Sequence, residues 1–516
     1  MTHERVSPAA CVHDDVSGTA ARSLSGGANW GAAMLAATLA ITLLRLLWLA
    51  IQPAGLYPDE AQYWLWSRHL AFGYYSKPPL VAWAIALTTA LFGDGSFAIR
   101  LPAPLCHAIA AAFVYGIGSR LYDRRVGFWA GFAYLTLPGV SVSGFVISTD
   151  AVLLACWAAA LYAFIRAREA GGAWWLAVGL ATGLGLLAKY AMGYWLLSAF
   201  ALVLASRAER RHLPALCGAF ALALLLYLPN LWWNWHNGFA SYLHLRDNAD
   251  LSGPLYHKGQ LAEFFLSQFA VFGPVFFALL LWLAAMPRLL AEPRARLLAA
   301  FALPTLVIIL VVSWLSRAHA NWAAPAYVSA SVLVVAFALG RGWRALVGFS
   351  VALHLAAAAL IFAGPPALAA LGRPLPARWD PLHRLRGWRT LGREVGGVLA
   401  AHPGWHLLAD DRESLAALVY YVRPHPFDAV HWNPGRIAKN QWDLTNDLTH
   451  YPGGNFLVVS ADHIFGELQG AFASVSRLRH LVIPIGPGAK RRYALYLARD
   501  FTGYPRDRRL PAPARR

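Results

Sequence analysis

The sequence predicts a polytopic α-helical membrane protein that carries a small α/β domain at its C-terminal end. Of its 516 residues, 58% are hydrophobic and only 14% are charged, a balance that soluble proteins of this length rarely have. The apolar residues fall in blocks of about 20, the length that crosses a hydrocarbon core of ~30 Å. Many of the 22 tryptophans stand at the ends of these blocks, where indole rings favour the membrane interface. A soluble protein is therefore excluded.

The apolar segments define the order of the membrane module. Residues 1–29 are polar and predict a cytoplasmic tail, followed by a first membrane helix that is too long for a cleaved signal peptide. The predicted segments are 30–52, 79–93, 103–119, 127–147, 151–165, 174–188, 191–206, 213–229, 261–285, 297–315, 324–340 and 345–363.

Arginine-rich connections set the orientation of these segments, since positive loops stay in the cytoplasm. They lie at residues 120–125, 166–168, 207–211, 288–296 and 341–344. This alternation leaves no room for a full crossing by segment 79–93, which is short enough to be re-entrant or interfacial. We therefore expect about 11 full crossings within a module at 30–363, with loop 53–78 and the C-terminus in the periplasm.

The C-terminal region, residues 364–516, differs in composition and predicts a periplasmic α/β domain. Short runs of strand-forming residues stand at 405–409, 455–460, 481–485 and 492–497. A helical pattern covers 412–421, between the first two runs. The strand order is not predicted.

The formal net charge of +18 indicates anionic lipid headgroups as a partner, because much of the excess lies in short connections between membrane segments. Nucleic acid is not predicted as a partner.

Loop 53–78 carries the first candidate site residues. Asp59 and Glu60 are adjacent carboxylates just beyond the first membrane helix, and a carboxylate in a water-poor pocket can deprotonate or orient an acceptor. Lys77 can bind a phosphate oxygen as a point charge, with Pro78 and Pro79 restricting the backbone beside it. An ordinary solvated acidic loop is the alternative.

Further candidates interrupt apolar runs on the same side of the membrane. Arg100 is a second candidate phosphate ligand, or else an arginine that snorkels to lipid headgroups. Asp150 is a candidate supporting group, or part of a helix cap with Ser148 or Thr149. The remaining supporting candidates are Lys189, Tyr190, Trp233 and His236, whose aromatic members suit either a sugar or the interface belt. No cofactor is predicted, and the histidine spacing gives no support to a divalent metal.

Several of these residues lie in motifs that resemble the membrane module of bacterial family 39/83 glycosyltransferases, relatives of protein O-mannosyltransferases and of aminoarabinose transferases acting on lipid A. The motifs are Pro58-Asp-Glu-Ala-Gln-Tyr-Trp, Tyr75-Ser-Lys-Pro-Pro-Leu, Arg100-Leu-Pro, Ser148-Thr-Asp and Asn321-Trp-Ala-Ala-Pro-Ala-Tyr. The resemblance implies a C-type glycosyltransferase fold and inverting transfer from a polyprenyl-phosphate sugar at the periplasmic face of the inner membrane. It places Asp59 at the catalytic aspartate and Lys77 near the donor phosphate.

One residue departs from the pattern. Aminoarabinose transferases tend to have a metal-holding Glu before the lysine, and this chain has Ser76, so no metal is carried over. The acceptor (lipid A or lipopolysaccharide, another glycan, a lipid or a protein) and the sugar stay open. A multi-pass transporter or lipid flippase is the alternative function, since charges within membrane segments also mark transport paths.

Overall fold

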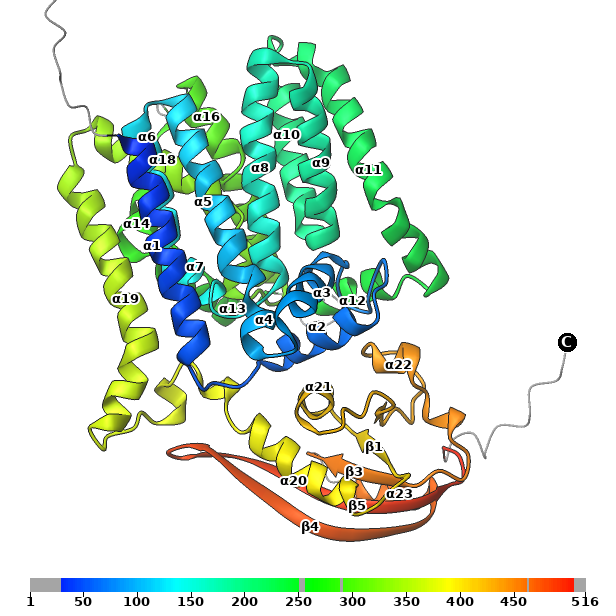
Figure 1. The fold of residues 1–516 in the computed structure, drawn as a ribbon. Helices are drawn as coiled ribbons and strands as arrows, with labels where there is room; N and C mark the ends of the chain where they lie inside the picture. Colours follow the sequence, from blue (N-terminus) through cyan, green and yellow to red (C-terminus); the bar gives the residue numbers. More distant parts are fainter. Residues whose placement is uncertain (1–28, 250–255, 288–290, 462–463, 505–516) are drawn as a thin grey trace, which may run out of the picture.

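The computed structural model describes residues 29–249, 256–287, 291–461 and 464–504. The predicted cytoplasmic tail at 1–29 lies outside these residues except for Asn29. A helical bundle forms the larger part of the described chain, and a smaller α/β domain packs against one end of it (Figure 1). We call this end of the bundle the domain end.

The longest helices run between the two ends of the bundle. In chain order the bundle helices are α1 (Trp30–Ile51), α5 (Pro102–Leu121), α6 (Arg124–Thr136), α8 (Thr149–Ala170), α9 (Ala173–Ala188), α10 (Gly193–Ala205), α11 (Leu213–His236), α14 (Pro274–Ala284), α16 (Pro293–Ala300), α17 (Leu303–Leu315), α18 (Ala326–Gly340) and α19 (Arg344–Ala370). Shorter helices gather near the domain end: α2 (Pro58–Arg68), α3 (Leu80–Phe92), α4 (Ser96–Arg100), α7 (Pro138–Ser143), α12 (Ala240–Ala249) and α13 (Lys258–Val271).

The described chain is that of a multi-pass membrane protein. Six of its helices are long and apolar enough to span a membrane, or up to seven if a bent pair counts as one span. The connections between α5 and α6, α8 and α9, α10 and α11, and α18 and α19 lie at the end of the bundle remote from the C-terminal domain (Figure 1). These are four of the five arginine-rich connections. The number of full crossings stays a prediction.

Two of the predicted apolar segments are each divided between two helices. Segment 261–285 forms α13 and α14, which bend by 116° between Val271 and Pro274. Gly273 adopts φ +87° there, and Pro274 begins the new helix because it cannot donate to the preceding turn. Segment 127–147 is also broken, since α6 ends at Thr136 and Pro138 begins α7.

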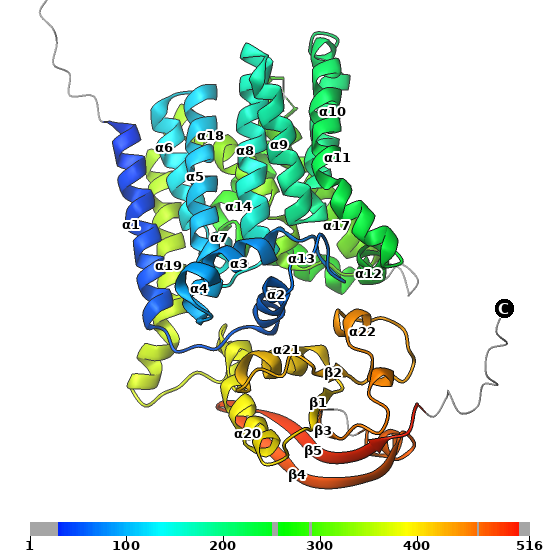
Figure 2. The ribbon, with the colours of Figure 1, turned by 45° about the vertical axis from the view of Figure 1, so that its right-hand side comes forward.

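Segment 79–93 forms α3, which lies with α2 and α4 across the domain end rather than along the bundle (Figures 1 and 2). Its 13 residues span only about 20 Å at the rise of an α-helix, less than the hydrocarbon thickness. This arrangement agrees with an interfacial segment.

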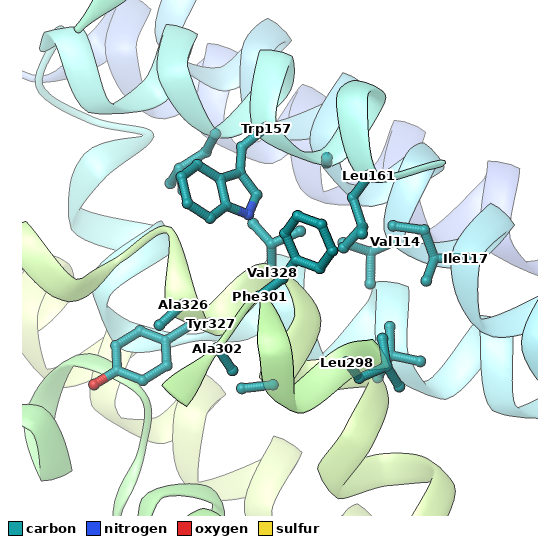
Figure 3. Packing of buried hydrophobic residues seen from close by; sticks show 14 of the residues in the cluster. Val114, Ile117, Trp157, Leu161, Leu298, Phe301, Ala302, Ala326, Tyr327 and Val328 are labelled. Carbon is teal, nitrogen blue, oxygen red and sulfur yellow. The ribbon is translucent and has the colours of Figure 1, made fainter. Parts of the chain in front are cut away.

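The bundle core is filled by residues from helices far apart in the sequence. Figure 3 shows Trp157 and Leu161 of α8 beside Phe301, with Val114 of α5 and Val328 of α18 close by. These five side chains are fully buried. Their burial holds the early and late halves of the chain together.

The C-terminal domain contains a five-stranded sheet of order β2-β1-β3-β5-β4. Its strands are β1 (His406–Ala409), β2 (Val430–His431), β3 (Phe456–Ser460), β4 (Phe472–Gly486) and β5 (Ala489–Phe501). Strand β1 pairs in parallel with β2 and β3, whereas β5 is antiparallel to β3 and β4. The predicted strands and the helix at 412–421, here α21 (Arg412–Tyr421), are confirmed.

A hydrophobic cluster joins this domain to the short helices of the domain end. Trp64 of α2 is fully buried and packs edge-on against Tyr420 of α21 at 5.0 Å between ring centroids. The Leu56 N–H donates to the Tyr421 hydroxyl at 2.6 Å. The two parts of the chain therefore share one core at their junction.

Close packing of α20 (Trp388–Ala400) on α21 depends on Gly392, where an added Cβ would lie 2.3 Å from the Cβ of Tyr421. We expect Gly392→Ala to lower the free energy of unfolding by about 1–3 kcal/mol through overpacking. Gly397→Ala on the same helix has open space at the Cβ, so it should leave stability unchanged or raise it slightly. Thermal unfolding of the two purified variants checks this, and equal melting temperatures would contradict it.

Candidate active site

Helix α2 presents Asp59 and Glu60 in its first turn. Pro58 begins the helix, where its missing N–H costs no hydrogen bond, and acidic side chains near a helix N-terminus are favoured by the helix dipole. The two neighbouring carboxylates then point to different surroundings.

Glu60 forms a buried ion pair with Arg100, and both side chains are 0% exposed. Arg100 Nε donates to Glu60 Oε1 at 2.8 Å, and Nη2 donates to Oε2 at 2.6 Å. The backbone N–H groups of Tyr57 and Ile147 also donate to the Glu60 carboxylate, and Arg100 donates to the Gly55 carbonyl. The pair therefore ties together α2, α4 and the connection before α8.

Asp59 meets a cation from the C-terminal domain. Arg412, the first residue of α21, donates from Nη1 to Asp59 Oδ1 at 2.6 Å and to Gln62 Oε1 at 2.7 Å. The Asp59 side chain is 38% exposed, and its second oxygen accepts no hydrogen bond from the described residues. Arg412 thus orients the carboxylate and leaves one oxygen open.

Lys77 is held by a tight loop between α2 and α3. Tyr74 and Lys77 exchange backbone hydrogen bonds, and the Tyr74 ring stacks on Trp66 at 4.5 Å. The Tyr75 N–H donates to Gln441 of the C-terminal domain at 2.7 Å. These contacts fix the backbone from which Lys77 projects.

Asp150 lies in the first turn of α8 and binds two groups from other helices. Lys189, which follows α9, donates to Oδ1 at 2.6 Å, and Asn321 donates to Oδ2 at 2.8 Å. The alternative role of the motif as a helix cap is also present, since the Asp150 N–H donates to Ser148 Oγ. Asp150 therefore takes part in the helix cap and also bridges α8 to Lys189 and Asn321.

These groups line a cavity of about 580 Å³, which we call the polar cavity. Its charged lining residues are Asp59, Lys77, Asp150, Lys189, Arg317, Arg384, Arg412 and Lys439. Both carboxylates are already paired with cations. Lys77, Arg317 and Lys439 make no ion pair in the part of the chain that the structure describes, so the cavity suits a ligand with more than one negative charge.

Burial perturbs two of the bases in the polar cavity. Burial lowers the pKa of the Lys77 ammonium from its usual range, and the nearby charge of Lys189 lowers it further. Burial lowers the pKa of His244 to about 4, with Lys77 as the next cause. His244 is therefore neutral at physiological pH.

A second cavity of about 480 Å³, the apolar groove, opens among the membrane helices. Its walls come from α7, α8, α13, α18 and α19, and they are almost entirely apolar. Ser148, Asp150 and Asn321 line both cavities. The two spaces therefore meet at the Asp150 cluster, so that an amphipathic ligand fits with its tail in one and its headgroup in the other.

The predicted site residues divide into two groups. Asp59, Lys77, Asp150 and Lys189 line the polar cavity, while Glu60 and Arg100 bind each other outside it. Tyr190, Trp233 and His236 also stand outside its lining. Trp233 packs where a Cβ on Gly73 would be, 2.5 Å from its ring, and thus supports the lysine loop.

Sequence reasoning missed the cations that the C-terminal domain and the α17–α18 connection supply, namely Arg317, Arg384, Arg412 and Lys439. Asn321 belongs to one of the family-like motifs, and this motif was the one sequence signal for the α17–α18 connection. The sequence does not distinguish Arg412 from any other charged residue in the first turn of a helix in a polar domain.

Comparison with known proteins assigns this chain to a family. Residues 76–233 match the family model described as dolichyl-phosphate-mannose-protein mannosyltransferase. The lipid A galacturonosyltransferase RgtD of Rhizobium johnstonii is 34% identical over 422 residues, which cover 80% of this chain and 88% of that protein. The chain belongs to the C-type membrane glycosyltransferases.

Other relatives agree with this family. The undecaprenyl phosphate-alpha-4-amino-4-deoxy-L-arabinose arabinosyl transferase of Pseudomonas savastanoi pv. phaseolicola is 26% identical over 43% of the chain and 47% of its own length. The crystal structure of ArnT from Cupriavidus metallidurans bound to undecaprenyl phosphate aligns with a TM-score of 0.61 over 90% of this chain and 98% of that one, at 17% identity. The transferase therefore has an ArnT-like C-type fold.

The Glu60–Arg100 pair predicts a large loss of stability when one partner is removed. Glu60→Gln leaves Arg100 buried without its counter-charge and should cost about 3–5 kcal/mol. Arg68→Gln, which breaks an exposed pair with Asp94, should cost at most about 1 kcal/mol. Thermal unfolding and the yield of monodisperse protein measure both; a stable but inactive Glu60→Gln would instead indicate a catalytic role.

Proposed function

We propose that this transferase moves a sugar from a polyprenyl-phosphate carrier to lipid A or lipopolysaccharide at the periplasmic face of the inner membrane, with inversion at the anomeric carbon. The single observation that carries the proposal is the junction of the polar cavity and the apolar groove at Asp150. A polyprenyl-phosphate sugar has the matching chemistry: a long apolar tail, an anionic phosphate and a polar sugar.

The orientation follows from charge. Arginine-rich connections lie at the end of the bundle opposite the C-terminal domain, and positive loops stay in the cytoplasm. The polar cavity then opens to the periplasm, where a donor activated by its phosphate bond needs no nucleotide. About 11 full crossings remain our proposal for the membrane module.

The tail of the donor lies in the apolar groove, and its phosphate sits near Lys77 and the Lys189–Asp150–Asn321 cluster. Asp59 accepts the proton of the acceptor hydroxyl, whose oxygen attacks the anomeric carbon from the face opposite the phosphate. The bond from that carbon to the phosphate oxygen breaks, and its electron pair leaves with the phosphate. Lys77 offsets the growing negative charge in a water-poor cavity, where fixed charges act strongly.

Glu60 and Arg100 act as positioning residues in this mechanism, because their pair fixes the first turn of α2 and so the place of Asp59. We do not assign them contact with donor or acceptor. The transporter alternative loses its support, since the relatives are named transferases.

The transferred sugar is an acidic one in our proposal. Arg317 and Lys439 remain free of ion pairs within the described residues after Lys77 is assigned to the phosphate. A uronic acid carboxylate is the matching group, and RgtD is named as a galacturonosyltransferase.

Lipid A from cells that make the wild-type transferase should gain the mass of one uronic acid residue. Asp59→Asn should lower the rate of this addition by about 10²–10⁴-fold, because the hydroxyl then loses its base. Glu169→Gln, at an exposed pair with Arg120, is the matched control. Mass spectrometry of lipid A measures the product. Addition by Asp59→Asn at the wild-type rate would refute the catalytic role of Asp59. Addition of a neutral sugar would refute only the proposal that the sugar is acidic.

The lowered pKa of Lys77 predicts a pH dependence of donor binding. Lys77 holds phosphate only when protonated, so affinity for polyprenyl phosphate should fall as pH rises through its lowered pKa. Lys77→Arg keeps its charge and should move this decline to higher pH, whereas Lys77→Gln should bind at least about tenfold more weakly at pH 7 and should lack the decline. Calorimetric titration from pH 7 to 10 measures this; identical profiles for wild type and Lys77→Arg would contradict the role of Lys77.

A further inference from the structure

A third lipid-sized space lies between α1 and α19, on the side of the bundle where these two outer helices run along each other (Figures 1 and 2). An apolar cavity of about 350 Å³ is lined by both helices and by residues of the α6–α7 region. A mouth of about 550 Å³ lies where α1 and α19 end against the C-terminal domain. Trp48 and Phe362 line both parts, so we treat them as one groove, the α1–α19 groove.

Three side chains of the first helix carry buried N–H groups without a hydrogen-bond partner: Arg45 Nη1, Trp48 Nε1 and Gln52 Nε2. The residues are spaced by three and four positions, which puts them on one face of α1 and its C-cap. All three line the α1–α19 groove. Buried donors are rarely left unpaired in proteins, and three of them on residues that line one space point to an acceptor-bearing molecule there.

The mouth of the groove is positively charged. Arg386 and Arg389 line it, together with the first turn of α20, whose free backbone N–H groups favour an anion. Arg386 pairs with Asp380, but Arg389 makes no ion pair within the described residues. No carboxylate side chain of the described chain lines the mouth.

We propose that the α1–α19 groove binds one anionic diacyl phospholipid. The phosphate sits at the mouth with Arg389 and the start of α20, and the ester oxygens accept from the unpartnered N–H groups of α1. An acyl chain then fills the apolar cavity beside Phe362 and Leu355. A free anion would satisfy only the mouth, whereas the phospholipid matches the donors and the apolar lining together.

This site is distinct from the donor site. The α1–α19 groove shares no lining residue with either the polar cavity or the apolar groove. It adjoins the polar cavity through two stretches of chain, because Gly55 and Leu385 line the mouth while Tyr57 and Arg384 line the polar cavity. A bound phospholipid therefore supports the segment that leads into α2 and Asp59.

Native mass spectrometry of the full-length protein tests the proposal, with phosphatidylglycerol and phosphatidylcholine of identical chains as probes. Wild type should retain one phosphatidylglycerol about tenfold more tightly than phosphatidylcholine. Arg389→Gln should lose this preference, and Trp48→Phe, which keeps an aromatic side chain and removes the N–H, should weaken retention of both lipids. Arg393→Gln, one turn further along α20 and exposed, is the matched control and should behave as wild type.

Equal retention of the two lipids by wild type, or an unchanged preference in Arg389→Gln, overturns the proposal. Displacement of the lipid by inorganic phosphate overturns it as well, because the acyl chain would then contribute nothing. Lys77→Gln alters the donor site alone and should retain phosphatidylglycerol normally. If that variant loses phosphatidylglycerol, the lipid binds in the donor groove and the proposed α1–α19 site is wrong. The proposed transfer reaction would be unaffected by this result.

Discussion

The buried ion pair of Glu60 and Arg100 is the interaction on which the rest of the site depends. Taking two charges out of water is costly, and a buried pair is tolerated only when hydrogen bonds satisfy it. Glu60 meets this condition with donors from Arg100, Tyr57 and Ile147. Asp59 directly precedes Glu60, and Asp150 stands three residues after Ile147. The Glu60–Arg100 ion pair thus positions both carboxylates of the polar cavity, although the pair itself lies outside the cavity.

The C-terminal domain forms part of the site rather than an appendage to it. Arg412 binds the carboxylate of Asp59, and Arg384 and Lys439 add to the cationic lining. The shared hydrophobic cluster around Trp64 holds the domain against α2, so these cations have a defined position relative to the membrane helices. The proposed preference for an acidic sugar arises from this combination, since the membrane helices and their loops supply only half of the cavity's cations.

Sequence patterns predicted the positions of the helices and strands better than the breaks between consecutive helices. Hydrophobic runs located the long helices, and alternating runs located β1, β3 and the later strands, because burial imposes these periods. The bend between α13 and α14 was missed, although Gly273 and Pro274 mark it, because an apolar run on both sides hides a break. For the candidate site, the sequence analysis selected Asp59 and Lys77 by their side-chain chemistry in loop 53–78 and by the motifs around them. It selected Asp150 and Lys189 because they interrupt apolar runs, where charges are costly and seldom incidental.

By itself, the sequence determined that this protein lies in a membrane, which end of the bundle carries the arginine-rich connections, and that carboxylates and lysines gather near the other end. Only the tertiary structure decided that Asp59 faces the cavity and Glu60 does not, that Arg100 binds a carboxylate, and that Arg412 comes from 353 positions away to meet Asp59. The physical reason is that a charge acquires its role from the partners and the water around it. Those neighbours come from distant parts of the chain, which local spacing does not specify.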